Sequence, residues 1–87
     1  MSYRIALYRE VEKTLDGLDR TAARRIEAKI DKLALDPFSP RLFRQMETLK
    51  DQRFSRVGDW RIIFRVIEAD GILDIVAIKP RDKAYRK

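Results

Sequence analysis

Cationic side chains recur through the second half of this 87-residue chain, on segments that alternate in the manner of β-strands. The residues concerned are Arg53, Arg56, Arg61, Arg65, Lys79, Arg81 and Lys83, with Tyr85 close behind. Cations on a small sheet compete with the packing of that sheet, so their repetition suggests a cleft that binds phosphate. Histidine is absent, so an enzyme of this kind would need another group for its proton transfers.

Several other chemistries are excluded by residues that the chain lacks. Without His or Cys there can be no Ser–His or Cys–His nucleophile, no disulfide and no thiolate metal site, and a structural zinc site is not expected. The only glycines are Gly17, Gly58 and Gly71, which rules out a glycine-rich phosphate loop. The Asp and Glu residues show no convergent spacing. We therefore expect no metal and no cofactor.

Arginine suits a phosphate site because its guanidinium can bind two phosphate oxygens at once. Within residues 60–67, Arg61 and Arg65 share one face by the two-residue period of a strand. The other face carries Ile62, Phe64 and Val66 and is the better core face. Arg61 is therefore expected to project away from the main core. Arg53 and Arg56 fall on opposite faces of the preceding strand, so at most one can join Arg61 unless a bulge intervenes.

Each of these arginines also has an ordinary structural interpretation, as a solvated charge on the surface of a sheet. We prefer that interpretation for Arg65. For Arg61, which lies beside Trp60, a functional role is favoured, and for Arg53 and Arg56 the two interpretations are evenly balanced.

The tail holds a second arginine and a tyrosine. Arg81 and Tyr85 are four residues apart, so they would share one face if the tail turned helically. A tyrosine in a cationic cleft could stack on a base or move a proton. On its own, Tyr85 is better interpreted as an aromatic residue that covers the edge of the sheet.

The elements that must position these residues follow from hydrophobic periodicity. Residues 3–8, 53–57, 60–67 and 72–78 are predicted as strands, and 9–15 and 20–35 as helices. The stretch 42–49 is ambiguous and is interpreted as a loop with a short strand. The order is β-α-α-β-β-β-β, followed by a tail that forms a helical turn or stays irregular. We predict a small, single α+β domain over residues 1–87, with two helices on one face of a mostly antiparallel sheet.

Local signals support these boundaries. Asp19 is the expected N-cap of the longer helix, whose apolar stripe includes Ile26 and Ile30, and Pro37 is expected to end it. Gly58 begins one predicted turn, and an Asp-Gly pair at residues 70–71 marks a hairpin.

Composition limits the class of protein. The chain is 45% hydrophobic and 39% charged, too apolar for a disordered chain, and no stretch approaches the ~18 apolar residues of a membrane span. The net charge of +6 would suit a nucleic acid or an acidic protein as partner, although a basic surface without any partner has the same charge. A cytoplasmic protein is the simplest interpretation.

Three segments carry a resemblance to a known family. They are Arg56-Val57-Gly58-Asp59-Trp60-Arg61-Ile62-Ile63-Phe64, then Ile78-Lys79-Pro80-Arg81, then Tyr85-Arg86. Together with the order of the elements, they resemble the RelE/ParE superfamily, the toxin halves of type II toxin–antitoxin pairs. The RelE branch implies a ribosome-dependent endoribonuclease that cuts mRNA in the ribosomal A site and inhibits translation. ParE-like members instead poison DNA gyrase by binding, and a third possibility is a weakened homologue that mainly binds its antitoxin.

The resemblance also implies roles for individual residues. Arg61 would stabilise the transition state, Arg81 would act near the leaving group, and Tyr85 would position or deprotonate the substrate. Further contacts to RNA would come from the flanking cations, namely Arg53, Arg56, Lys79, Lys83 and Arg86. The sequence departs from the family in lacking the strand lysines of RelE-type members, and Pro80 stands where relatives often have Lys or His. The general base is therefore open. The implied partners are an acidic antitoxin that is partly disordered when free, the ribosome and mRNA.

Overall fold

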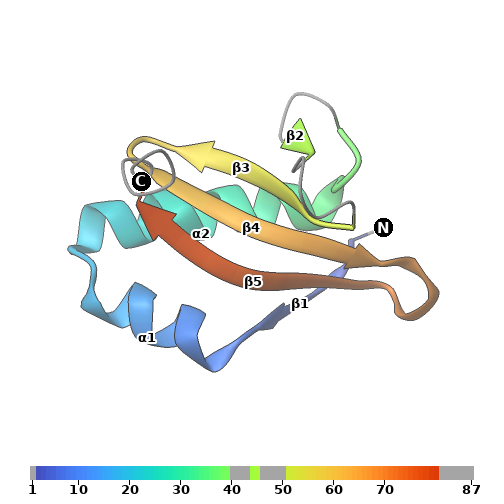
Figure 1. Ribbon diagram of the computed structural model, residues 1–87, viewed down its shortest axis with the longest axis horizontal. Helices are drawn as coiled ribbons and strands as arrows, with labels where there is room; N and C mark the ends of the chain where they lie inside the picture. The colour runs from blue at the N-terminus through green and yellow to red at the C-terminus, as the bar shows by residue number, and fades with distance from the viewer. Residues whose placement is uncertain (1, 40–43, 46–50, 81–87) are drawn as a thin grey trace.

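The computed structural model describes residues 2–39, 44–45 and 51–80. Its elements are β1 (Arg4–Leu7), α1 (Arg9–Gly17), α2 (Arg20–Leu35), β2 (Arg44–Gln45), β3 (Arg53–Val57), β4 (Trp60–Ile67), the 3-10 turn η1 (Glu68–Asp70) and β5 (Ile72–Pro80) (Figure 1). This order confirms the prediction. Most of the ambiguous stretch 42–49 and the whole tail 81–87 lie outside the described residues.

The strands form one sheet in the order β1-β5-β4-β3-β2. The first and last strands, β1 and β5, run parallel to each other, and every other neighbouring pair is antiparallel. β4 lies between β5 and β3, in agreement with the apolar residues on both of its faces. None of the described helices is both long and apolar enough to cross a membrane.

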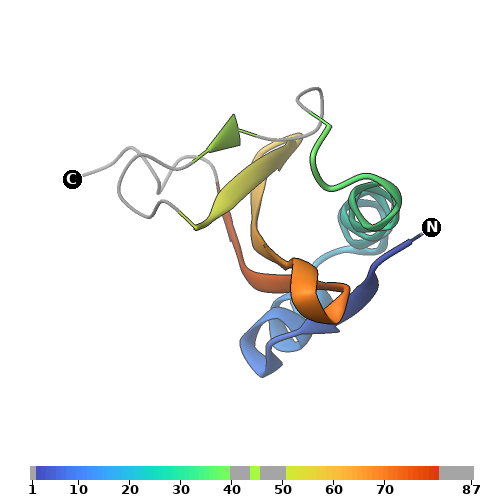
Figure 2. The same ribbon diagram turned by 90° about the vertical axis from the view of Figure 1, so that its right-hand side faces the viewer.

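Both helices pack on the same face of the curved sheet, so neither covers the other face (Figure 2). The side chains of Ile26 and Leu33 in α2 are fully buried, as the apolar stripe predicted, and pack with Ile62 and Phe64 of β4. α2 ends at Leu35, two residues before the proline that was expected to stop it.

A β-bulge in β5 reconciles its sequence with a single buried face. Ile63 pairs with Ala77 but the next residue of β4, Phe64, pairs with Ile75, so Val76 is the extra residue. The bulge shifts the alternation by one position, and Ile75 and Ile78 therefore both face the helices although they are an odd number of positions, three, apart. The bulge thus sets the side of the sheet on which Lys79 emerges.

The first turn of α2 supplies a test of the local structure. The carboxylate of Asp19 accepts a hydrogen bond of 2.8 Å from the backbone N–H of Ala22. We expect Asp19→Ala to lower the free energy of unfolding by about 1 kcal/mol, measured by urea denaturation. The backbone N–H of Ala22, in the first turn of the helix, would lose the carboxylate that accepts its hydrogen bond. Asp16→Ala is the matched control, since its exposed carboxylate lies at the negative end of the α1 dipole and its loss should not destabilise the protein. Equal losses for the two variants would contradict the role of the cap.

Candidate functional site

Three cations lie side by side across three neighbouring strands. Arg61 of β4 has Arg56 of β3 as its Cα partner on one side and Lys79 of β5 on the other. Residues directly opposite each other in an antiparallel sheet project from the same face, so the three form a row, here called the basic row. Like charges at such positions repel each other, and a bound anion would relieve that repulsion.

Arg61 is the centre of the basic row and the only half-buried member of it, since Arg56 and Lys79 are exposed. Its guanidinium carbon lies 4.3 Å from the centroid of the Phe54 ring. Phe54 is the partner of Ile63, two residues from Arg61, so the ring reaches the guanidinium diagonally across the face. A cation stacked on an aromatic ring is held in place without losing its charge, which prepares it to bind an anion.

The register of β3 against β4 decides which of the two β3 arginines lies beside Arg61. Arg56 is the Cα partner of Arg61, whereas Arg53 pairs with the buried Phe64 and projects towards the helices. The guanidinium carbon of Arg53 lies 5.2 Å from the ring centroid of Phe38, which follows α2. The structure therefore does not bring Arg53 to the basic row.

Arg65 has a structural partner on the surface of the sheet, in agreement with the structural interpretation preferred for it, although it forms a defined ion pair and is more than a solvated charge. Its Nε donates a 3.0 Å hydrogen bond to the carboxylate of Asp74, the residue directly opposite on β5, and Asp51 lies within 3.8 Å of its Nη1. The Asp74 carboxylate is buried, and the hydrogen bond to it raises the pKa of Arg65 above its ordinary value. Arg65 therefore remains protonated and is committed to a structural partner.

The two strand ends nearest the basic row also meet. Pro80, the last residue of β5, lies opposite Trp60, the first residue of β4. The chain therefore leaves the sheet at the end where Arg61 and Lys79 lie. The other predicted site residues, Arg81, Lys83, Tyr85 and Arg86, fall outside the described residues.

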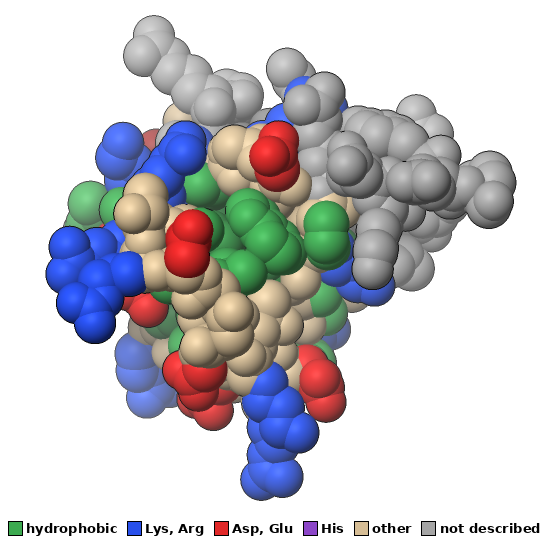
Figure 3. Space-filling model, turned by 90° about the vertical axis from the view of Figure 1, so that its left-hand side faces the viewer, with side chains coloured by type: hydrophobic (Ala, Val, Ile, Leu, Met, Phe, Trp, Pro, Cys, Tyr) green, Lys and Arg blue, Asp and Glu red, His purple; other side chains and the backbone are tan. Residues whose placement is uncertain are grey.

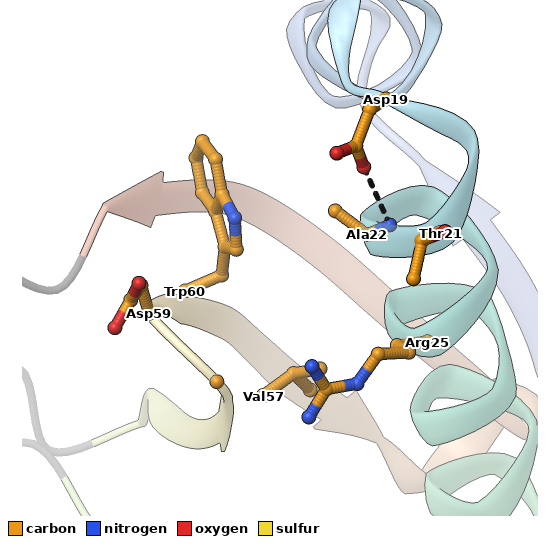
Figure 4. A pocket seen from close by; sticks show the side chains of 8 residues that line it. Asp19, Thr21, Ala22, Arg25, Val57, Asp59 and Trp60 are labelled. Atoms are coloured by element: carbon orange, nitrogen blue, oxygen red, sulfur yellow. Dashed lines mark hydrogen bonds between the residues drawn. The ribbon is translucent and has the colours of Figure 1, made fainter.

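A pocket of about 230 Å³ lies beside this end of the sheet, between the first turns of α2 and the turn that joins β3 to β4. In the close-up view, Trp60 lines one side, Asp19 and Ala22 line the other, and the Arg25 side chain reaches from the helix towards Val57 (Figure 4). The space-filling view of this end shows apolar side chains near its centre, bordered by carboxylates, with Lys and Arg side chains further out on several sides (Figure 3).

Arg25, which lines this pocket, was not among the predicted site residues. The signal that could have found it is the spacing of Arg25, Lys29 and Lys32, which lie four and three residues apart on one helix. Among the described residues, no three Asp or Glu side chains are grouped so that they could hold a metal ion.

Residues 5–85 match the model of a protein family described as the ParE toxin of type II toxin–antitoxin systems, parDE. The chain belongs to this family. It is thus the toxin of a type II toxin–antitoxin system, within the RelE/ParE superfamily. No curated protein sequence matches it.

Solved structures of RelE toxins share the fold of this ParE-family chain. RelE in the archaeal RelE–RelB complex of Pyrococcus horikoshii is 29% identical, with a TM-score of 0.79 over 93% of this chain and 97% of that one. The toxin–antitoxin complex RelBE2 of Mycobacterium tuberculosis gives 16% identity and a TM-score of 0.80 over 93% and 100%. A mutant of Escherichia coli RelE in the free state is 13% identical, with a TM-score of 0.81 over 97% of this chain and 88% of that one.

These likenesses span nearly the whole ParE-family chain, so its helices and sheet are those of the superfamily. Two of the three relatives were solved as complexes of a toxin with its antitoxin. The family model is that of ParE toxins and the solved structures are those of RelE toxins, so the comparisons place the chain in the superfamily without separating its two activities.

Proposed function

We propose that this toxin is a RelE-like mRNA interferase, a metal-independent endoribonuclease that cuts translated mRNA on the ribosome and acts in the cytoplasm. The observation that carries the proposal is the basic row of Arg56, Arg61 and Lys79 on the face opposite the helices. Such a row is suited to a phosphodiester because each phosphate carries a full negative charge, and Arg61 is already oriented by Phe54.

The proposed reaction uses the nucleophile that RNA itself contains. The 2′-OH of one nucleotide attacks the adjacent phosphorus, the bond from phosphorus to the 5′ oxygen of the next nucleotide breaks, and a 2′,3′-cyclic phosphate and a 5′-OH result. Arg61 would stabilise the extra negative charge of the transition state, with Arg81 near the leaving oxygen. Tyr85 would orient the 2′-OH or take its proton.

Arginine is a poor general base because its pKa lies above ~12, so the protein would depend on charge stabilisation and on a substrate that is already bent for attack. A ribosome that presents the mRNA in the A site would supply such a geometry. Arg56 and Lys79 would contribute RNA contacts from the basic row, and Lys83 and Arg86 from the tail. Arg53 would reach RNA only outside the row, because it lies on the helix side of the sheet.

An antitoxin is the second expected partner. Relatives with the same fold were solved as complexes with RelB antitoxins, which supports a similar partner for this chain. We propose that it is partly disordered when free and acidic where it covers the basic row, so that its binding weakens as salt is raised.

The test is to map mRNA 5′ ends after brief induction of the toxin in cells, with and without a drug that stalls translation. We expect cuts inside coding regions, in register with codons, which disappear when translation is stalled. Growth arrest with intact mRNA would overturn the proposal.

The family model favours one alternative, a ParE-like inhibitor of DNA gyrase that acts by binding. A supercoiling assay with purified gyrase separates the two. Inhibition of supercoiling with no cleavage of RNA would support the gyrase-inhibitor hypothesis, whereas cleavage of RNA without inhibition of gyrase would support the interferase. No growth arrest at all would indicate a weakened homologue that mainly binds its antitoxin.

A further inference from the structure

A second basic site lies on the helix side of the sheet. A groove of about 320 Å³ runs between α2 and the end of β3, and it is lined by Arg25, Ala28, Lys29, Lys32, Arg56, Val57 and Gly58. It is here called the α2–β3 groove. Of the seven lining residues in the described part of the chain, four are cations and none is acidic. It was not among the predicted site residues, apart from Arg56.

The helical repeat explains why three of the cations line up. Arg25, Lys29 and Lys32 each come directly before a residue that is buried in the core, so they form a stripe beside the buried stripe and extend over roughly 10 Å of the helix. The acidic residues of the same helix, Glu27 and Asp31, are exposed and do not line the groove.

The sheet supplies the opposite wall of the groove. β2 pairs with β3 only at Arg53 and Phe54, so among the described residues no strand covers the edge of β3 from Ser55 to Val57. Gly58 follows with φ +57°, and a Cβ atom there would lie 3.5 Å from a guanidinium nitrogen of Arg25. The turn therefore brings bare backbone beneath the Arg25 side chain, at the boundary between this groove and the pocket lined by Trp60 (Figure 4).

Arg56 connects this groove with the basic row. Its backbone is paired with Arg61 in the sheet, and the same residue also lines the α2–β3 groove at the edge of β3. An RNA backbone bound at Arg61 could therefore continue past Arg56 to the cations of α2 and remain on a positively charged surface.

We propose that the α2–β3 groove binds the phosphodiester backbone of RNA outside the nucleotides that are cut. This proposal deepens the interferase function and rests on it for its biological meaning. A phosphodiester is favoured over a protein partner because the apolar lining, among the residues that the structure describes, consists of Ala28 and the buried Val57. Protein partners obtain most of their affinity from large apolar or aromatic anchors, whereas Lys and Arg alone suffice to hold phosphates.

The test measures binding without cleavage. The probe is a single-stranded 2′-O-methyl RNA, whose blocked 2′ oxygen cannot attack, and its affinity is followed by fluorescence anisotropy over a range of salt concentrations. Loss of two phosphate contacts in the double variant Lys29→Gln/Lys32→Gln should make the slope of log K against log salt shallower by about 1.4, at ~0.7 for each contact.

The matched control removes the same charge elsewhere. Lys13→Gln/Arg24→Gln replaces two exposed cations, one on α1 and one on α2, that do not line the groove. We expect this variant to keep the wild-type slope. Circular dichroism and thermal unfolding establish that each variant is folded, and the single variant Lys32→Gln, at an exposed position, provides the same test with about half the shift, ~0.7, if the double variant is unstable.

The outcomes separate the two proposals. Equal slopes for the groove variant and the control variant would overturn the groove as an RNA site, as would a loss of affinity that is confined to an acidic antitoxin peptide. If the groove variant changed the salt slope but the wild-type toxin left mRNA intact in cells, the groove would stand as an RNA site and the interferase function would be overturned.

Discussion

Replacement of Arg61 by alanine is expected to slow cleavage of ribosome-bound mRNA by about 10²- to 10³-fold, the usual cost of one preorganised donor to a transition-state oxyanion. The expectation follows from the position of Arg61 at the centre of the basic row, between Arg56 and Lys79. Single-turnover cleavage of mRNA in the A site of programmed ribosomes measures the loss directly, because it isolates the chemical step from binding and release.

Two further variants make this result specific. Arg61→Lys keeps the charge but loses the bidentate contact, so its rate should fall between those of alanine and arginine. Arg24→Ala removes an exposed arginine of α2 that lines neither the basic row nor the groove and should cleave as the wild type does. If folded Arg61→Ala protein cleaved as fast as Arg24→Ala, Arg61 would have no role in the chemistry.

The largest effect on stability is expected from Phe64→Ala, which should lower the free energy of unfolding by about 3–5 kcal/mol. Phe64 is fully buried in the central strand, next to its partner Ile75 on β5, and its side chain faces the helices. Its removal therefore leaves a cavity between the sheet and the helices. Urea denaturation followed by circular dichroism measures the change. Because small domains are stable by only about 5–15 kcal/mol, the variant should also unfold at a clearly lower temperature.

Phe38→Ala is the matched control for this prediction. Phe38 is 39% exposed and contacts Tyr3 and Arg53 from the segment after α2, so its loss should cost far less. If Phe64→Ala proved too unstable to purify, Phe64→Leu would replace it and should show a smaller loss. Equal stability losses at the two phenylalanines would show that the described core is not where the protein obtains its stability.

The candidate site was predictable in part. The alternation of residues 60–67 placed Arg61 on the face opposite the core, and this is where it lies. The same alternation could say only that Arg53 and Arg56 point in opposite directions. Which of them meets Arg61 depends on the pairing of β3 with β4, and that pairing is a property of two strands together.

Arg65 and Val76 show the same limit. Neither the ion pair of Arg65 with Asp74 nor the bulge at Val76 has a local signal, because each depends on how β4 and β5 align across a turn. The bulge in turn sets the face from which Lys79 emerges, so one local irregularity helps to build the basic row.

By itself, the sequence determined the order of the elements, the central position of β4, the N-cap at Asp19 and the absence of imidazole and thiol chemistry. These depend on local periodicity, local hydrogen bonds and composition, all of which can be read along the chain. Only the tertiary structure decided that Arg56, Arg61 and Lys79 form a row and that the cations of α2 share a groove with Arg56. Those contacts join residues far apart in sequence, and their geometry is set by strand register and by the packing of α2 against the sheet.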